Sequence, residues 1–256
     1  MQLIAAALME ELAVALSLCS DRTRMVRAGV RAWTAVHTGK TIHFVRTGMG
    51  PHRSAVSLEK LLGSFRPAEI LVIGYAGALS QELKVGTLAI IRRVSILGGA
   101  EGIPVPLEEA TAGQGWELVH GSRLLEIARA TGVPACLCDG LTSAHIIGEP
   151  GQKHFLNDRF GAGIIDMETA ALARVAATEG IPLSCVRSVS DDVDDTFLAP
   201  FTYAPDLTAL GRARKVVSAR RWFQRYGEWR RRAALARDSL RKFLTAYLNQ
   251  DSGVSS

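Results

Sequence analysis

The sequence Ile70-Leu71-Val72-Ile73-Gly74-Tyr75-Ala76-Gly77-Ala78-Leu79 is the stretch from which the fold is predicted. Its first four residues are apolar on both faces of a strand, which is typical of a central sheet that helices cover on both sides. The glycines that follow allow a ligand to approach the backbone at the carboxyl end of the strand, although a plain tight turn has the same composition. Gly77 is therefore a candidate ligand contact.

Strand-like and helix-like segments alternate on both sides of this stretch. Short runs rich in β-branched residues predict strands, and apolar residues at helical spacing predict helices. The alternation favours a three-layer α/β fold, with a long Gly- and Pro-rich loop near a site at residues 98–115. The predicted strands are residues 3–8, 41–47, 70–73, 88–94 and 183–189, and the predicted helices are residues 51–62, 122–130 and 166–179.

The composition narrows the class of protein further. The chain has 256 residues, 48% of them hydrophobic and 21% charged, which excludes a collagen-like or disordered chain and suffices for one substantial core. No run of about 18 uninterrupted apolar residues occurs, and the N-terminus lacks the basic region of a secretory signal. The four cysteines have no C-x-x-C spacing and the six histidines form no H-x-x-x-H pair, so we expect free thiols, no metal and a cytoplasmic protein.

The positive charge is concentrated near the C-terminus. The net charge is +5, but residues 212–242 hold 12 Lys and Arg against two acids, so the remainder is mildly acidic. We expect a domain over residues 1–210 and a basic helical segment over residues 211–248. Apolar residues recur from Trp222 to Tyr247 at steps of four and three, which predicts one amphipathic helix. The first interpretation of this segment is a helix docked on the body or on a dimer interface. The second is a helix that lies on the inner, anionic face of a membrane, and nucleic-acid binding is the least favoured interpretation.

A second glycine turn, Thr47-Gly48-Met49-Gly50-Pro51-His52-Arg53, joins a predicted strand to a predicted helix. Backbone N–H groups at such a helix start bind phosphate or sugar hydroxyls. Gly48 and Gly50 are therefore candidate substrate contacts, and Arg46 and Arg53 are candidate phosphate-binding residues. The turn is not a dinucleotide fingerprint, because Arg53 stands where the third glycine belongs. A plain turn remains the alternative.

Two acidic stretches follow later in the chain. Asp166-Met167-Glu168 precedes an Ala-rich helix, so Glu168 is expected to be buried with a definite partner, although an acid at a helix start is often only a cap. Asp191-Asp192-Val193-Asp194-Asp195 ends a strand, and mutual repulsion among its carboxylates would raise the pKa of one of them toward neutrality. A calcium loop is the competing interpretation, but the glycine and terminal Glu of an EF-hand are missing.

Taken together and in this order, these stretches resemble the nucleoside phosphorylase superfamily, in particular its methylthioadenosine/S-adenosylhomocysteine nucleosidases. The resemblance spans residues 1–200 and is most specific at D-M-E and V-R-x-x-S-D. It implies a single α/β/α domain with a mixed, partly barrel-like sheet, cleavage of the N-glycosidic bond of a purine-type nucleoside, no metal or organic cofactor, and a homo-oligomer. The matching stretches are Ala7-Leu8-Met9-Glu10-Glu11-Leu12, Thr47-Gly48-Met49-Gly50, Gly74 to Leu79 with Leu83-Lys84-Val85-Gly86, Asp166-Met167-Glu168 and Ser190-Asp191.

The resemblance also implies a role for individual residues. Asp191 would be the general acid that protonates the departing purine, held in place by Ser190. Glu168 would accept hydrogen bonds from the ribose hydroxyls and stabilise the cationic sugar of the transition state, with Met167 packed against the sugar face. Glu11 matches the carboxylate that activates the attacking water in the nucleosidases.

Departures from the family pattern leave the base and the acceptor open. Tyr75 stands where the nucleosidases carry a small residue, and their base-stacking Phe has no counterpart near His145-Ile146-Ile147, so Ile147 is the expected contact. The arginine that the phosphorylases pair with the second glycine cluster is missing, so both water and phosphate remain as acceptors. The basic tail is similar to that of hopanoid-associated phosphorylases, which makes a lipid-linked nucleoside, adenosyl-hopane, an alternative substrate. A non-catalytic nucleoside-binding module with a membrane-binding tail is the other alternative.

Overall fold

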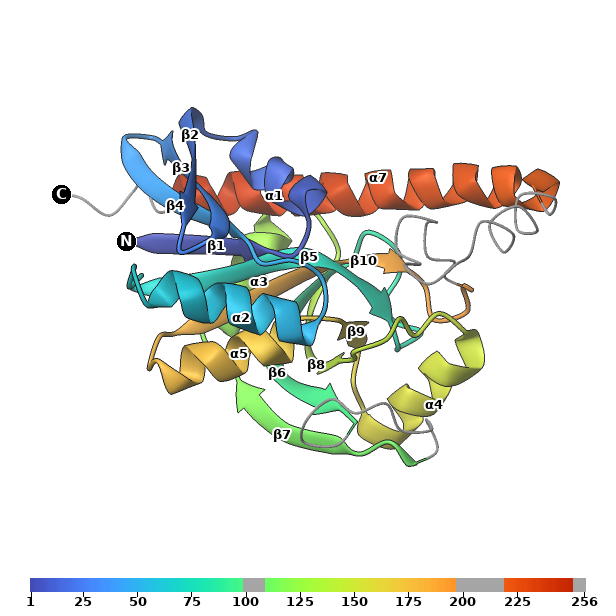
Figure 1. Cartoon of the computed structure of the whole chain (residues 1–256). Coiled ribbons are helices and arrows are strands. Elements are labelled where there is room, and N and C mark those ends of the chain that lie inside the picture. The colour runs from blue at the N-terminus through green and yellow to red at the C-terminus, as the bar shows by residue number, and fades with distance from the viewer. Residues whose placement is uncertain (99–108, 197–218, 251–256) are drawn as a thin grey trace.

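One mixed sheet of ten strands forms the centre of the molecule, and helices pack on both of its faces (Figure 1). The computed structural model describes residues 1–98, 109–196 and 219–250, the last range with side chains from residue 231. The alternating order of strands and helices along the chain produces the three-layer α/β/α fold that was predicted from the sequence.

Parallel strands occupy the middle of the sheet. β5 (Glu69–Ala78) pairs in parallel with β1 (Gln2–Ala6) and with β10 (Leu183–Asp191), and β1 pairs in parallel with β4 (Lys40–Arg46). All four lie where the sequence predicted strands. Because they run in the same direction, the segments that follow them meet at one edge of the sheet, which is where ligands bind in α/β folds.

Further strands close part of the sheet into a ring. β6 (Leu88–Leu97) pairs antiparallel with β10 and parallel with β8 (Ala135–Thr142), and β9 (Ile164–Asp166) lies between β8 and β5. Because β10 pairs with both β6 and β5, the strands β5, β10, β6, β8 and β9 form a closed circuit. The expectation of a mixed, partly barrel-like sheet is confirmed.

The edges of the sheet hold strands that the sequence did not reveal. The hairpin of β2 (Ser20–Arg27) and β3 (Val30–His37) continues the sheet beyond β4, and β7 (Ala112–Glu117) pairs antiparallel with β6. The predicted loop over residues 98–115 is therefore wrong in its last part, because the backbone of β7 bonds to β6 at the edge of the sheet instead of approaching a site. Residues 99–108 of that loop lie outside the described residues.

Two hydrophobic cores lie on opposite faces of the sheet. Successive residues of a strand point to opposite faces, so Leu3 and Val72 enter one core while Ile4 and Ile73 enter the other. The first core is covered by α2 (Pro51–Leu62) and α5 (Thr169–Thr178), and the second by α1 (Met9–Leu16), α3 (Gly121–Ala130) and α7 (Ala219–Gln250). A smaller cluster packs beneath α4 (Pro150–Phe160).

Two local predictions need correction. The predicted strand over residues 70–73 is too short, because β5 runs from Glu69 to Ala78 and includes Gly74 and Gly77, which excludes the alternative of a plain turn there. The predicted helix start at Ser122 is also shifted, because the helix begins at Gly121 after His120, which adopts a left-handed backbone with φ of 63°.

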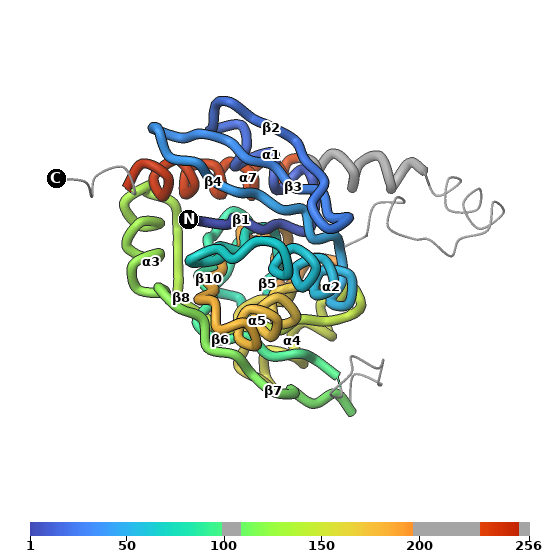
Figure 2. The backbone as a smooth tube through the Cα atoms, turned by 60° about the vertical axis from the view of Figure 1, so that its left-hand side comes forward, coloured from blue at the N-terminus to red at the C-terminus, as the bar shows by residue number. Residues whose placement is uncertain are grey.

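The C-terminal helix α7 runs along the body on the same side as α1 (Figure 2). Leu240, Phe243 and Tyr247, which the sequence placed on one apolar stripe, are buried in the second core, and Ala236 of the same stripe is also buried. The first interpretation, a helix docked on the body, is therefore confirmed for residues 231–250. The side chains of the stripe before residue 231 and the predicted domain boundary at residue 210 lie outside the described residues.

The opposite side of α7 is basic, with exposed Arg231, Arg237, Arg241 and Lys242. Within the described ranges, no helix combines the length and the apolar character needed to cross a membrane. Contact of α7 with a membrane surface, assembly into a homo-oligomer and a cytoplasmic location stay predictions. All four cysteines lie in the described part of the chain and are free thiols.

Candidate active site

A cavity of about 480 Å³ lies at the carboxyl ends of β1, β5 and β10. We call it the acidic cavity, because Glu10, Glu11, Asp166, Glu168 and Asp191 all line it. Most of the residues that the sequence predicted as a site come together in its wall. These are Glu11, Gly77, Ile147, Met167, Glu168, Ser190 and Asp191.

Helix N-termini position the acids of the cavity. Glu11 lies in the first turn of α1, and Glu168 immediately precedes α5. Gly50 immediately precedes α2 and donates its backbone N–H to Glu168 Oε1 at 3.0 Å. The N-terminal end of a helix carries partial positive charge and unpaired N–H groups, so these three helix starts stabilise carboxylates in the cavity.

Glu11 is held in place by the backbone on both sides of the cavity. Its side chain is buried, with Oε2 accepting a hydrogen bond from the Leu8 N–H at 2.8 Å and Oε1 from the Tyr75 N–H at 3.0 Å. Burial raises the pKa of Glu11, while the charge of Arg187 and the two backbone N–H groups oppose that rise. The result is a fixed carboxylate with an enhanced affinity for a proton.

Arg187 is the buried cation at the centre of the acids. Although it lies in β10 among apolar residues and is only 1% exposed, its Nη2 bonds Thr169 Oγ1 at 2.8 Å and Asp166 Oδ2 at 2.7 Å. The same nitrogen lies 3.6 Å from Glu168 Oε2. Burial acts to lower the pKa of Arg187, but the nearby carboxylates outweigh it and raise that pKa, so the guanidinium stays charged. A buried charge is tolerated only with such partners.

Gly74 creates the space in which Arg187 and Glu11 meet. A Cβ placed on Gly74 would lie 2.2 Å from Arg187 Nη1 and 2.6 Å from Glu11 Oε1, so no other residue fits there without displacing one of them. Nη1 has no hydrogen-bond partner among the described residues. A buried donor of this kind is costly unless a ligand satisfies it. The pair therefore presents a donor and an acceptor side by side.

Glu168 is the acid whose protonation the site alters most clearly. It is 5% exposed, and burial, together with the nearby charges of Asp166 and Glu11, raises its pKa to about 8, against the opposing effects of Arg187 and the Gly50 N–H. The burial expected from the sequence is confirmed. A carboxyl group of this kind gains its charge readily when a positive charge develops beside it.

Both carboxylate oxygens of Asp191 accept hydrogen bonds. Oδ1 accepts a hydrogen bond from Ser190 Oγ at 2.7 Å, and Oδ2 accepts one from Lys153 Nζ at 2.5 Å. A Cβ on Gly77 would lie 3.0 Å from Oδ2, so this glycine allows the carboxylate to approach β5. The side chain is 6% exposed and faces the acidic cavity.

The remaining carboxylates of the acidic turn do not form a repelling cluster with Asp191, contrary to the expectation from the sequence. Each has its own partner, so separate contacts hold the turn. Asp192 Oδ1 accepts from the Val85 N–H at 2.7 Å, Asp194 pairs with His154 at 2.8 Å, and Asp195 pairs with Arg232 and accepts from the Asp192 N–H at 2.8 Å.

The candidate phosphate-binding arginines do not enter the acidic cavity. Arg46 is half-buried at the end of β4 and Arg53 is exposed on α2, and neither is among the described residues that line the cavity. The stem of Arg53 packs over Gly48, where a Cβ would lie 2.5 Å from its Cδ. Gly48 also has a φ of +88°, which favours glycine. The shape of the turn and the packing of Arg53 over it therefore explain Gly48 and Arg53 without a bound phosphate.

The other wall of the cavity is more apolar. Ile146 and Ile147 from the segment after β8 lie in it, together with Met49 from the glycine turn. α7 adds Ala233 and Ala234, and Arg237 stands beside them. The cavity thus has an acidic side next to the sheet and an apolar side that α7 helps to form.

Sequence reasoning missed Arg187 and Lys153, the two buried cations of the site. Arg187 did carry a signal, because it is the one charged residue in the apolar run of residues 183–189. Lys153 carried none, because α4 has no marked apolar face and its other positions are mostly polar. Among the described residues, no group of three or more His, Cys, Asp or Glu side chains is arranged to hold a metal ion.

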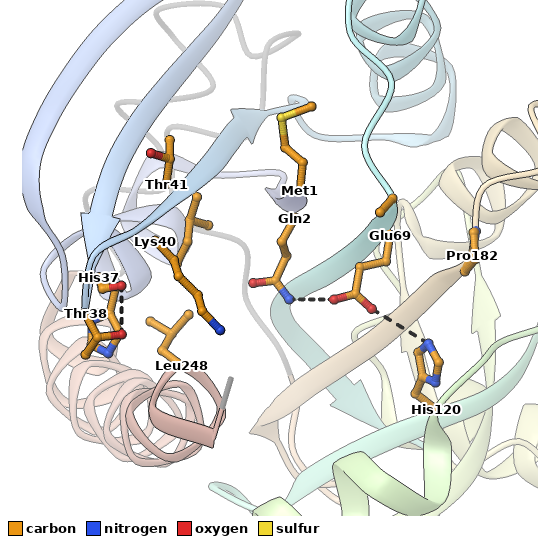
Figure 3. A pocket seen from close by; sticks show the side chains of 12 residues that line it. Met1, Gln2, His37, Thr38, Lys40, Thr41, Glu69, His120, Pro182 and Leu248 are labelled. Carbon is orange, nitrogen blue, oxygen red and sulfur yellow. Dashed lines mark hydrogen bonds and ion pairs between the residues drawn. The ribbon is translucent and has the colours of Figure 1, made fainter. Parts of the chain in front are cut away.

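A second cavity, of about 470 Å³, lies at the amino ends of β1, β4 and β5 (Figure 3). We call it the opposite cavity and define it by Gln2, Lys40, Glu69 and His120. Glu69 accepts a hydrogen bond from Gln2 Nε2 at 2.9 Å and lies 3.7 Å from His120 Nε2. None of the residues that the sequence predicted as a site lines this cavity, as far as the chain is described.

Comparisons with known proteins agree on one family. A family model described as "Phosphorylase superfamily" matches residues 3–219. A 5'-methylthioadenosine/S-adenosylhomocysteine nucleosidase from Halalkalibacterium halodurans is 30% identical over 183 residues, which cover 69% of this chain and 77% of that protein. A protein of the same name from Geobacillus thermodenitrificans is 27% identical over 223 residues, covering 84% and 94% of the two chains.

A solved structure supports the same fold. The 5'-methylthioadenosine/S-adenosylhomocysteine nucleosidase from Campylobacter jejuni superposes with a TM-score of 0.73 over 99% of both chains, at 16% sequence identity. At that identity the likeness speaks for the fold alone. The superposition includes nearly the whole length of both proteins.

Proposed function

The chain belongs to the phosphorylase superfamily and cleaves the N-glycosidic bond of a purine-type nucleoside, and we propose that water is the acceptor in this reaction. The observation that carries the proposal is the pair of Glu11 and Arg187 beside Gly74, where a buried carboxylate oxygen and a buried, unpartnered N–H donor lie together. A water molecule needs both, because it donates to the base that activates it and accepts from a second group.

Phosphate fits this cavity poorly. Its described lining residues include five Asp and Glu side chains and one arginine, Arg237 of α7. A phosphate dianion would therefore meet repulsion from the acids. The sugar of the transition state, in contrast, carries positive charge, and buried carboxylates stabilise it. The acids of the cavity therefore disfavour phosphate as the acceptor and favour the cationic sugar of the transition state.

Asp191 is the proposed general acid. A purine leaves slowly as an anion, so protonation of the ring by a nearby carboxyl group accelerates departure by roughly 10²- to 10⁴-fold. The hydrogen bond from Ser190 to one of its oxygens supports this role, because it fixes the direction of the carboxyl group. Proton delivery requires that geometry before it requires any particular pKa.

Glu168 and Met167 are the proposed sugar contacts. Glu168 receives the Gly50 N–H on one oxygen and faces Arg187 with the other, so the carboxylate is oriented into the cavity from two sides. Hydrogen bonds from ribose hydroxyls and the growing positive charge on the sugar would both draw a proton off Glu168 and strengthen its contact in the transition state. Met167 lines the cavity next to it.

The proposal is tested by the fate of the sugar. A panel of adenosine, inosine and 5'-methylthioadenosine is incubated with and without phosphate in ¹⁸O-labelled water, and the sugar product is analysed by mass spectrometry. We expect free sugar carrying the label at C1, at a rate independent of phosphate. Sugar 1-phosphate, formed only when phosphate is present, would contradict the proposal.

Replacement of the proposed base provides the matching variant. Glu11→Gln keeps the size of the side chain but cannot accept a proton, so kcat should fall by about 10²-fold or more while KM changes little. Glu59→Gln on α2, half-exposed and remote from the cavity, is the control and should retain wild-type rates. A Glu11→Gln enzyme with unchanged kcat would remove Glu11 from the mechanism.

A further inference from the structure

Lys153 is the most completely buried cation of the site and has no role in the reaction as described so far. It lies in the first turn of α4 with 0% exposure. Its ammonium group donates to Asp191 Oδ2 at 2.5 Å, to the Asp192 carbonyl at 2.8 Å and to the Asp195 carbonyl at 3.1 Å. A lysine has three N–H donors, and all three are directed at this single turn.

Packing alone does not explain a lysine at this position. Lys153 and Leu156 are the two buried residues of α4, and an apolar side chain at residue 153 would bury the same surface without the desolvation of a charge. Replacing both partners of a buried ion pair by apolar residues is often neutral or stabilising in proteins, so stability by itself does not require such a pair. The contacts of the ammonium group with Asp191 and its turn therefore need a reason other than stability.

The backbone around Asp191 is irregular where the lysine contacts it. The register between β10 and β5 shifts between Val189 and Asp191, so the ladder of hydrogen bonds does not fix this end of the strand by itself. Ser190 restrains one carboxylate oxygen, and Gly77 leaves room for the other. The remaining restraint on the second oxygen is the lysine.

We propose that Lys153 is a positioning residue for Asp191, whose ammonium group fixes both the carboxyl group and the turn that carries it. The inference rests on the proposed function, because it concerns the general acid of that reaction. The turn is joined to α7 by the ion pair of Asp195 with Arg232. Ala233 and Ala234, the next two residues of α7, line the acidic cavity. The turn that Lys153 holds is therefore also joined to the apolar side of the site.

The experiment compares two substrates that differ in their need for an acid. Inosine or adenosine requires protonation of the departing base, whereas 4-nitrophenyl riboside releases a phenolate that leaves without a proton. Lys153→Met should lower kcat for the purine nucleoside about 10²-fold, with KM changed less than about 3-fold and nitrophenyl riboside cleavage nearly unchanged. Lys153→Arg retains the cation and should recover most of the purine rate.

Asp191→Asn is the reference variant that separates this inference from the proposed function. If Asp191→Asn slows both substrates equally, Asp191 is not the acid and the proposed function fails. If Asp191→Asn slows only the purine nucleoside but Lys153→Met slows both equally or neither, the acid stands and the positioning role of Lys153 is overturned. Lys60→Met, an exposed lysine on α2, is the matched control and should leave both rates unchanged.

A double-mutant cycle on the purine nucleoside covers the case in which Lys153→Met does not fold or the riboside is a poor substrate. The cycle uses Lys153→Gln, which keeps a polar side chain but removes the charge. If Lys153 acts through Asp191, Lys153→Gln should change kcat less in the Asp191→Asn background than in the wild-type background. Equal changes in the two backgrounds would show that the lysine acts independently of the acid and would contradict the inference.

Discussion

The acidic cavity and the opposite cavity have almost the same volume, about 480 and 470 Å³, but differ in the burial of their charges. Glu11, Glu168 and Asp191 are each at most 6% exposed, whereas Glu69 in the opposite cavity is half-buried and His120 is exposed. Size therefore does not identify the site. What identifies it is charge held out of water by specific partners.

The direction of the strands explains the difference. α1 and α2 follow the carboxyl ends of the parallel strands β1 and β4, and α5 follows β9, which runs antiparallel to β5. The N-terminal ends of all three helices face carboxylates. The opposite cavity lies at the amino ends of the same strands, where Lys40, His37 and His120 form part of the wall (Figure 3). The backbone thus favours acids at one end of the sheet and not at the other.

The largest expected effect is on catalysis, and it is tested by exchanging one acid in each cavity for its amide. Asp191→Asn should reduce kcat/KM for purine nucleosides by about 10²- to 10⁴-fold, because the departing base loses its proton donor. Glu69→Gln in the opposite cavity should leave the rate within about 2-fold, since surface substitutions away from a site have small effects. Steady-state kinetics on both variants measure the contrast, and similar losses in the two would remove the distinction between the cavities.

A second test concerns stability. Arg187→Met leaves Asp166 and Glu168 buried without their cation, and breaking a buried ion pair costs about 3 to 5 kcal/mol of unfolding free energy. Urea unfolding measures this loss directly. Arg66→Met, at an exposed pair with Glu179, is the control and should hardly move the midpoint. A tolerated Arg187→Met would mean that the acids around Arg187 do not need it.

The smallest effect is the pH dependence of stability that Glu168 causes. Its folded-state pKa of about 8 lies above the ordinary value of 4.5, so the folded protein keeps a proton that the unfolded chain releases. Stability from this group therefore falls as pH rises from about 4.5 to about 8 and then levels off. Glu168→Gln should remove this fall, so its Tm relative to wild type should rise by several degrees between pH 5 and pH 8.5.

Thermal unfolding by circular dichroism across that pH range gives the comparison. Glu69→Gln in the opposite cavity serves as the control, because no comparable burial acts on its carboxyl group, and its Tm difference from wild type should stay constant. A constant difference for Glu168→Gln as well would contradict the raised pKa. The same variant should also lose the increase of kcat/KM with pH toward 8 that an essential Glu168 carboxylate causes.

Much of the acidic cavity was recognisable in the sequence because its acids follow local rules. Glu168 and Asp191 stand where a strand ends and Gly50 stands at a helix start, so short stretches of sequence reveal them, whereas Glu11 was identified only through the resemblance to the nucleosidases. The glycines of β5 were predicted as a ligand-contact region that follows the strand, with a plain turn as the alternative. Only the packed structure shows that Gly74 lies within the strand and makes room for Arg187 and Glu11.

The sequence by itself determined the alternation of strands and helices, the two apolar faces of the central strands and the acids available at their ends, because all of these depend on residues close together in the chain. Only the tertiary structure decided which charges meet. Lys153 and Asp191 are 38 residues apart and Glu11 and Tyr75 are 64 apart, so strand order and helix placement bring them together. No local pattern encodes such contacts, because burial and pairing of a charge depend on the whole fold.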